Sequence, residues 1–346
     1  MVTRKSHIDF AEMIDLASQR LGGAVLFAND EFFAPKENLL KEAAPIFIEG
    51  KYTDLGKWMD GWETRRKRAA NLDELSDWCI IRLGLPGMVR GVVVDTSFFR
   101  GNFPSHCSID ACTFDGDPNV SQILSTEWTE ILPKSELQGD TKNAFKIGHS
   151  NRVTHLRFNI FPDGGVARLR VHGEVVPDWQ RLISRQSEID LASVENGAMV
   201  IAASDMFYGH RHNLIMPGRA LNMSDGWETQ RRRGPGHDWC VVQLGATANE
   251  ISRIEVDTLW FKGNFPESCS VDTCESSGND LLELAKLEWK ELLPRKHLQG
   301  HTRHVFEDEL IRTGRATHVR LNIYPDGGVS RLRAFGRVAG DESSRR

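Results

Sequence analysis

The chain has 346 residues, of which 40% are hydrophobic and 26% charged, so it has the composition of packed globular domains rather than of a disordered protein. Its net charge of -5 argues against nucleic acid as the main partner, because neutralising phosphates requires clustered basic residues. No apolar run approaches the roughly 20 residues of a membrane span, and acidic residues interrupt Met1–Leu16, unlike a secretory signal. We therefore expect a cytoplasmic protein that binds neither nucleic acid nor membranes.

Short apolar or alternating segments predict a mostly β protein. Taken in chain order, a helix is expected over Phe10–Gln19, and then come strands bounded by Gly, Pro, Asn or Asp: Ala24–Ala28, Trp78–Leu83, Val89–Val94, Ser108–Cys112 and His155–Ile160. Further short helices are expected over Ser121–Ile131 and Asp280–Leu293, and part of Pro177–Glu188. Many short strands with turn residues between them are typical of a β-sandwich or jelly roll.

The sequence is a tandem duplication. Motifs of the first half recur in the same order in the second half: Ile14–Ser18 as Ile189–Ser193, Asp60–Thr64 as Asp225–Thr229, Gly101–Pro104 as Gly263–Pro266, and Thr154–Gly165 as Thr317–Gly328. The offset between the copies falls from 175 to 165 before Asp60, so the first copy carries a ten-residue insertion around Ala43–Lys57.

The duplication predicts an all-β chain of two tandem jelly-roll β-sandwich domains with short helices. The expected organisation is a first repeat over residues 1–178, a linker over 179–188, a second repeat over 189–340 and a polar tail over 341–346. The six cysteines show no zinc-like spacing, so buried free thiols of a reducing compartment are expected. No cofactor is predicted, and the sequence does not indicate a divalent metal.

The motifs Asp-Gly-Trp-Glu-Thr, Gly-Asn-Phe-Pro and Asn-x-[Phe/Tyr]-Pro-Asp-Gly-Gly, each present twice, resemble those of the allantoicase family, as does the opening segment Asn29–Ala34. The resemblance extends over roughly Leu21–Val338. It implies galactose-binding-like jelly rolls, a homo-oligomer, and hydrolysis of allantoate to ureidoglycolate and urea in purine and allantoin breakdown.

Allantoate is a carboxylate whose α-carbon bears two ureido groups, so its hydrolysis requires a cation, acceptors for ureido N–H groups, and an acid and a base. The loop that follows each Asp-Gly-Trp places an acid beside cations. We predict Glu63, Glu228 and His237 as catalytic residues. The predicted substrate-binding residues are the loop arginines and two asparagines that suit a ureido group: Arg65, Arg66, Arg231, Asn102 and Asn264.

Other polar residues favour structural roles. Asp30 and Asp205 are expected to cap turns or to bind a structural ion, and His155 and His318 to pack. The strand arginines Arg168 and Arg170 are expected to lie on a solvated or packing face, with carboxylate binding as the alternative. The copies differ at Arg65/Gln230 and Ser76/His237, which favours one dominant or composite site over two identical ones. The alternative function is a tandem carbohydrate- or small-ligand-binding module without catalysis, because jelly rolls serve that role too.

Overall fold

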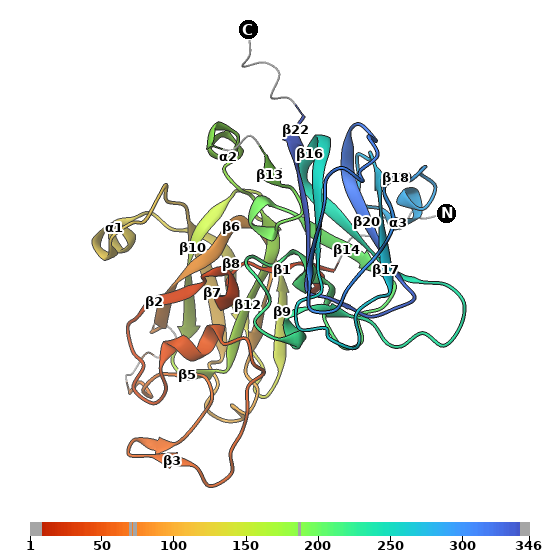
Figure 1. The fold of residues 1–346 in the computed structure, drawn as a ribbon. Helices are drawn as coiled ribbons and strands as arrows, with labels where there is room; N and C mark the ends of the chain where they lie inside the picture. Colours follow the sequence, from red (N-terminus) through yellow and green to blue (C-terminus); the bar gives the residue numbers. More distant parts are fainter. Residues whose placement is uncertain (1–8, 69–70, 72–74, 186–187, 340–346) are drawn as a thin grey trace, which may run out of the picture. The chain divides into compact units, whose positions relative to one another are not determined.

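The computed structural model describes residues 9–68, 71, 75–185 and 188–339. The chain divides into two compact units, one formed by Asp9–Val176 and the other beginning at Pro177. The first unit runs from red to yellow-green in Figure 1, and the second from green to blue. Helix α2 (Trp179–Arg185) occupies much of the segment expected to link the repeats, so the expected partial helix is present there.

The first unit contains one eight-stranded antiparallel sheet and two small strand pairs. In the large sheet the path β1-β12-β6-β10-β7-β8 is joined by β2 and β9, which both pair with β6. Its strands are β1 (Ile14–Asp15), β2 (Ala24–Ala28), β6 (Asp77–Asp95), β7 (His106–Cys112), β8 (Thr129–Glu136), β9 (Lys142–Lys146), β10 (Val153–Phe161) and β12 (Arg168–Val175). The small pairs are β3 (Tyr52–Thr53) with β4 (Gly56–Lys57), and β5 (Trp62–Glu63) with β11 (Gly165–Val166).

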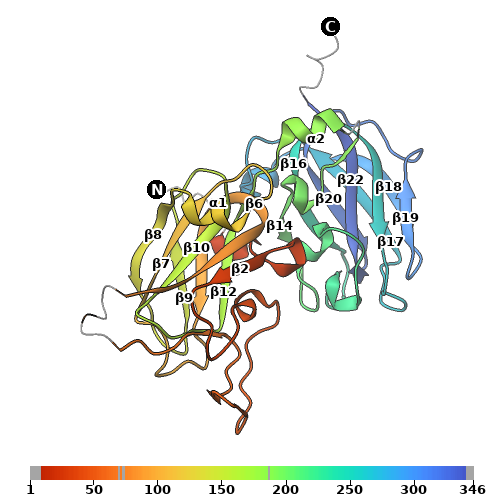
Figure 2. The ribbon, with the colours of Figure 1, turned by 90° about the vertical axis from the view of Figure 1, so that its left-hand side faces the viewer.

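Strand β6 belongs to both layers of the sandwich. Its N-terminal stretch, up to Arg82, pairs with β10 and β2, whereas the stretch from Gly87 to Asp95 pairs with β12 and β9. The two strands expected over Trp78–Leu83 and Val89–Val94 are therefore parts of one 19-residue strand. Figure 2 shows β6 beside β10, and β10 beside β7. The buried and partly exposed side chains of β6 alternate because one face of the strand lies on the core.

The second unit repeats this topology, with the path β13-β22-β16-β20-β17-β18 and with β14 and β19 on the long strand β16. Its large sheet comprises β13 (Ile189–Asp190), β14 (Met199–Ala203), β16 (Asp238–Asp257), β17 (Ser268–Cys274), β18 (Lys290–His297), β19 (Arg303–Phe306), β20 (Ala316–Tyr324) and β22 (Arg331–Val338). The small pair is β15 (Trp227–Glu228) with β21 (Gly328–Val329). The predicted class, two tandem jelly-roll-like sandwiches, is confirmed.

The helices are shorter than the sequence predicts. The expected helix over Phe10–Gln19 is wrong: this segment forms two 3₁₀ turns, Phe10–Glu12 and Gln19–Leu21, on either side of β1. An edge strand forms because Asp15 accepts backbone N–H bonds from Val171 and Ala17, which fix β1 against β12. The other two expected helices end early, as α1 (Val120–Ser125) and α3 (Leu281–Leu284), and strands β8 and β18 take up the remainder.

The cores contain the tryptophans of the two Asp-Gly-Trp-Glu-Thr motifs. Trp62 and Trp227 have no exposed surface. All six cysteines are buried free thiols, as predicted, and burial raises the pKa of Cys112 to about 12. None of the helices in the described part of the chain has the length and apolar character that crossing a lipid bilayer requires.

Candidate active site

A buried arginine fixes each Asp-Gly-Trp-Glu-Thr segment to the sheet. Arg168, 2% exposed, directs Nη2 to Asp60 Oδ2 at 2.6 Å and Nη1 to the Asp60 carbonyl at 2.9 Å. Its Nε donates to the carbonyl of Ala43 at 3.0 Å. One guanidinium therefore holds both ends of the segment between Ala43 and Asp60. Arg168 packs inside the repeat and is not solvated.

The second repeat has the same arrangement. Arg331, 4% exposed, pairs with Asp225 Oδ2 at 2.9 Å and donates to the Asp225 carbonyl at 2.6 Å. Its Nε donates to the carbonyl of Gly218 at 3.2 Å. The two arginines thus have a structural role, which explains why an acid and a distant arginine occur in both copies.

The tryptophan of each segment connects the site to a neighbouring turn. The indole N–H of Trp62 donates to the Asp30 carbonyl at 2.8 Å, and Trp227 donates to Asp205 in the same way at 2.8 Å. The Asp30 carboxylate accepts the N–H groups of Phe32 and Arg65, which is the turn-capping role expected from the sequence. The residue after each buried tryptophan is therefore presented from a fixed backbone.

The residue after each buried tryptophan is a glutamate that accepts a hydrogen bond from an asparagine side chain. In the first repeat, Asn102 Nδ2 donates to Glu63 Oε1 at 2.7 Å. Burial raises the pKa of the Glu63 carboxyl, and the hydrogen bond from Asn102 opposes that rise. The same contact occurs in the second repeat, where Asn264 Nδ2 donates to Glu228 Oε1. The structure thus brings together the predicted catalytic acid and the predicted asparagine of each copy.

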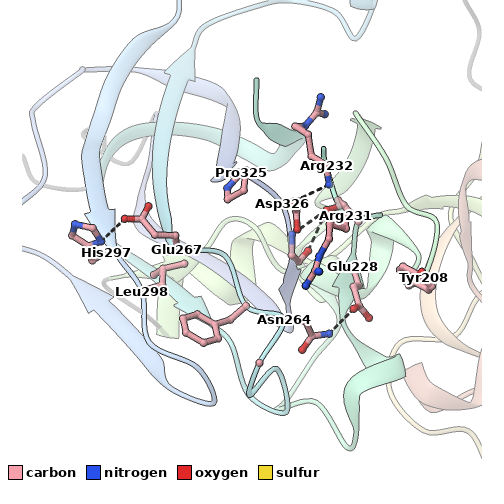
Figure 3. Close-up of a pocket in the computed structure, with 14 residues that line it drawn as sticks. Tyr208, Glu228, Arg231, Arg232, Asn264, Glu267, His297, Leu298, Pro325 and Asp326 are labelled. Carbon is pink, nitrogen blue, oxygen red and sulfur yellow. Dashed lines mark hydrogen bonds and ion pairs between the residues drawn. The ribbon is translucent and has the colours of Figure 1, made fainter. Parts of the chain in front are cut away.

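The glutamate of the second repeat lies on a cavity of ≈ 810 Å³ (Figure 3). Its wall includes Arg231, Asn264 and, from the cis-proline turn after β20, Pro325–Gly327. Thr229 fastens the site to that turn, because Gly327 N–H donates to its hydroxyl at 3.1 Å. Arg231 has an exposed side chain with no hydrogen-bond or ion-pair partner among the described residues, so its guanidinium is available to a ligand.

The glutamate of the first repeat lies on a smaller cavity of ≈ 360 Å³. Eight residues line it: Phe33, Lys57, Met59, Glu63, Phe98, Arg100, Gly101 and Asn102. Lys57 comes from the hairpin β3–β4 in the ten-residue insertion, which the second repeat lacks. The two sites therefore share a glutamate–asparagine pair but differ in size and in the cations around it.

The predicted arginines of the first repeat are placed differently from Arg231. Arg65 pairs with Asp30 at 3.2 Å and lies over the Phe32 ring at 4.4 Å. Arg66 is exposed and is absent from the lining of the cavity that holds Glu63. In these two cavities, which the described residues line, Arg231 is the one predicted arginine that lies beside the glutamate of its repeat.

His237 lies elsewhere in the second repeat. Its Nε2 is 3.3 Å from Asn322 Oδ1, and its ring centroid is 4.7 Å from that of Tyr324 on β20. It is absent from the lining of the cavity that holds Glu228. The structure therefore does not place His237 together with the other predicted catalytic residues.

A second ionisable pair, not foreseen as part of the site, lines the larger cavity. His297 Nδ1 lies 2.7 Å from Glu267 Oε1, at the end of the cavity away from Tyr208 in Figure 3. Glu267 aligns with Ser105, so the repeat gave no signal for it. His297, His301 and His304 are close in sequence, the spacing of a metal site, but His301 and His304 accept backbone N–H groups. Among the described residues no three His, Cys, Asp or Glu side chains are placed to hold a metal.

Comparison with known proteins gives a consistent result. The family model "Allantoicase repeat" matches residues 14–176 and 189–339. The chain is 51% identical to an allantoicase of Dictyostelium discoideum, over 93% of this chain and 86% of that protein. It is 49% identical to a probable allantoicase of Pseudomonas aeruginosa, over 95% of this chain and 97% of that protein.

Solved structures agree with the family model. The crystal structure of allantoicase from Saccharomyces cerevisiae, 38% identical, superposes with a TM-score of 0.77 over 93% of this chain and 92% of the yeast chain. A second allantoicase structure, also 38% identical, superposes with a TM-score of 0.78 over 94% of this chain and 93% of the other. With both repeats matched by the model and nearly the full length shared with these relatives, the chain belongs to the allantoicase family.

Proposed function

We propose that this chain hydrolyses allantoate to ureidoglycolate and urea in the cavity of the second repeat. The observation that carries the proposal is the placement of Glu228, held by Asn264, and the unpaired Arg231 on one cavity. A carboxylate acceptor and a free guanidinium are the two groups that a ureido carboxylate needs.

Substrate binding follows from charge and hydrogen-bond complementarity. Arg231 can hold the substrate carboxylate with two parallel N–H bonds. Because Asn264 donates its amide N–H to Glu228, its oxygen is left as an acceptor for a ureido N–H group. The cavity of ≈ 810 Å³ has room for both ureido arms.

The reaction breaks the bond between the α-carbon and one ureido nitrogen and forms a bond from that carbon to a water oxygen. Protonation of the departing nitrogen releases neutral urea and leaves an imine-like carbon. Water then adds to this carbon and gives up a proton. In our proposal the Glu228 carboxylate relays the protons. It takes the N–H proton of the retained ureido group and passes it to the departing nitrogen, then takes a proton from the attacking water and returns it to the imine nitrogen, so it ends the cycle as a carboxylate.

Urea release from allantoate by the purified protein, measured with and without added manganese, tests the activity. Replacing Glu228 by Gln removes the acid–base group and should lower kcat by about 10²–10⁴-fold. Replacing Arg231 by Met should mainly raise KM, because the carboxylate loses its cation. Matched controls are Glu309→Gln on an exposed turn and Arg233→Met, whose side chain is exposed and does not line the cavity.

Two results would contradict the proposal. Absence of urea above background under both metal conditions would argue against the activity itself. Full activity of Glu228→Gln, together with loss of activity in Glu63→Gln, would move the hydrolytic site to the first repeat.

We also propose that the protein acts on allantoate as a homo-oligomer in the cytoplasm. Six buried free thiols support a reducing compartment. Exposed apolar side chains of the insertion, among them Ile46 and Tyr52 at 53% and 70% exposure, are suited to contacts between copies. Sedimentation velocity of the purified protein tests the oligomer.

A further inference from the structure

The cavity of the first repeat has unused acceptors for a ligand. Glu63 Oε1 receives the Asn102 amide, whereas Glu63 Oε2 and Asn102 Oδ1 have no hydrogen-bond partner in the described part of the chain. Both atoms accept hydrogen bonds and both side chains line the cavity. Glu63 is also desolvated, which raises its carboxyl pKa. A hydrogen bond from a ligand N–H group to this carboxylate is stronger there than it would be in water.

The same cavity has an unused cation. Lys57 lines it and has no ion pair or hydrogen bond with any described residue; its ammonium lies over the Phe47 ring at 4.5 Å. Arg100, the other cation of the lining, is paired with Asp140 at 3.1 Å. Lys57 is therefore the cation available to an anionic ligand.

The insertion, with Phe47 and the hairpin β3–β4, forms the wall that the second repeat lacks. The Phe47 ring stacks on Phe98, with centroids 5.9 Å apart, and Phe98 lines the cavity. At Gly56 an added Cβ would lie 3.7 Å from the Phe33 ring, so this turn of the hairpin also rests against the lining. In the second repeat Trp260 stands in place of Phe98 and is 40% exposed. The ten-residue insertion thus supplies both the cation and a narrower enclosure.

We propose that the first repeat is a second ligand site, which binds a small ureido carboxylate through Lys57 on the carboxylate and through Glu63 and Asn102 on the ureido N–H groups. The ligand class rests on the proposed function. The smaller volume, ≈ 360 Å³ against ≈ 810 Å³, suits a molecule with one ureido arm, such as the product, better than one with two. The rings of Phe33 and Phe98 offer apolar faces to the planar ureido group.

Calorimetric titration of the full-length protein with hydantoate (N-carbamoylglycine) tests the proposal. This probe has one carboxylate and one ureido group and no group to expel. We expect two molecules bound per chain in the wild type, and a loss of about 10- to 100-fold in the affinity of one site in Lys57→Met, the effect of one charge-assisted hydrogen bond. The matched control is Lys51→Met, because Lys51 is on the same hairpin, lies over Trp58 at 3.8 Å and does not line the cavity.

Arg231→Met separates the two proposals. It should weaken the other site and leave the site that depends on Lys57. A single site lost in Arg231→Met and unchanged in Lys57→Met overturns the first-repeat site while the proposed function stands. A single site lost in Lys57→Met and unchanged in Arg231→Met supports the first-repeat site and removes the second repeat from substrate binding. Binding of two molecules with unchanged affinities in Lys57→Met, or no binding at millimolar hydantoate, also overturns the inference.

Discussion

Asn264 donates its side-chain amide to the Glu228 carboxylate, and Asn102 does the same for Glu63 across 39 residues of sequence. The contact fixes the carboxylate orientation and leaves one of its oxygens for substrate or water. Because a hydrogen bond to a charged group contributes about 1.5–3 kcal/mol, Asn264→Ala should lower kcat/KM by roughly 10- to 100-fold.

Because Asn264 both orients Glu228 and offers its amide oxygen to a ureido N–H group, Asn264→Ala should lower kcat and raise KM, and steady-state kinetics separate the two effects. Lys262→Ala, two residues earlier on the same loop and outside the cavity lining, should remain near wild type. Equal losses in both variants would indicate a general disturbance of the loop instead.

The buried pair of Arg168 and Asp60 predicts a large stability effect. Burial opposes ionisation of Asp60, and Arg168 is the stronger of the two cations that lower its pKa. Arg168→Met leaves only the half-exposed Lys41 beside the carboxylate, at a cost of about 3–5 kcal/mol in the free energy of unfolding. Urea denaturation measures the change. Arg100→Met removes an exposed pair with Asp140, which solvent screens, and should leave the free energy of unfolding close to that of the wild type. Similar costs for the two variants would contradict the structural role.

Two buried imidazoles predict loss of stability in acid. Burial lowers the pKa of both His155 and His318 to about 4, from an unfolded value of 6.5. The unfolded chain therefore binds protons first, so their contribution is complete above pH 6.5 and is lost as the pH falls toward 4. Each should contribute on the order of 1–3 kcal/mol over this range.

The unfolding free energy at pH 7.5 and pH 4.5 measures this loss, with His318→Gln as the comparison. Asp190 acts in the opposite direction, because burial raises its pKa to about 6 and favours its protonated form in the folded state. The difference between the variant and the wild type isolates the histidine, and it should be smaller at pH 4.5 than at pH 7.5. An unchanged difference would rule out the titration of His318.

His237 is expected to have little part in turnover. Its partners are Asn322 and Tyr324, and it is absent from the lining of the Glu228 cavity. His237→Gln should therefore keep kcat/KM within about threefold of wild type and leave the pH profile unshifted, since a surface-type substitution usually costs little. A loss of 100-fold or more would instead support the catalytic role that the sequence suggested.

The fold was predictable because the strands and turn residues that indicate a jelly roll occur in both copies of the repeat. All five expected strand segments lie in strands. The error at Phe10–Gln19 arose where Asp15, a distant partner of Val171, overrides local helix periodicity. Propensity carries no information about such long-range contacts.

The site was predictable only as separate parts. Glu228 and Asn264 were each chosen for their chemistry. Their contact depends on the pairing of β15 with β21 and on the bond from the Gly328 N–H to the Asn264 carbonyl, and the sequence reveals neither. Conversely, Asp60 and Arg168 are charged residues of the kind found in active sites, but they are buried and paired with each other, so their role is structural. Glu267 had no counterpart in the first repeat and gave no signal at all.

The arginine that bonds both ends of the Asp60 segment also explains how the repeats diverged. Asp60 follows Ala43 by 17 residues, whereas Asp225 follows Gly218 by 7, and the difference is the whole ten-residue insertion. Because the entropy of closing a loop rises only slowly with its length, a segment fastened at both ends can grow without disturbing the sandwich below it. Loops of different length and sequence can therefore be grafted between these two contacts. A duplicated domain can change the wall of its binding site in this way while its β-sandwich stays the same.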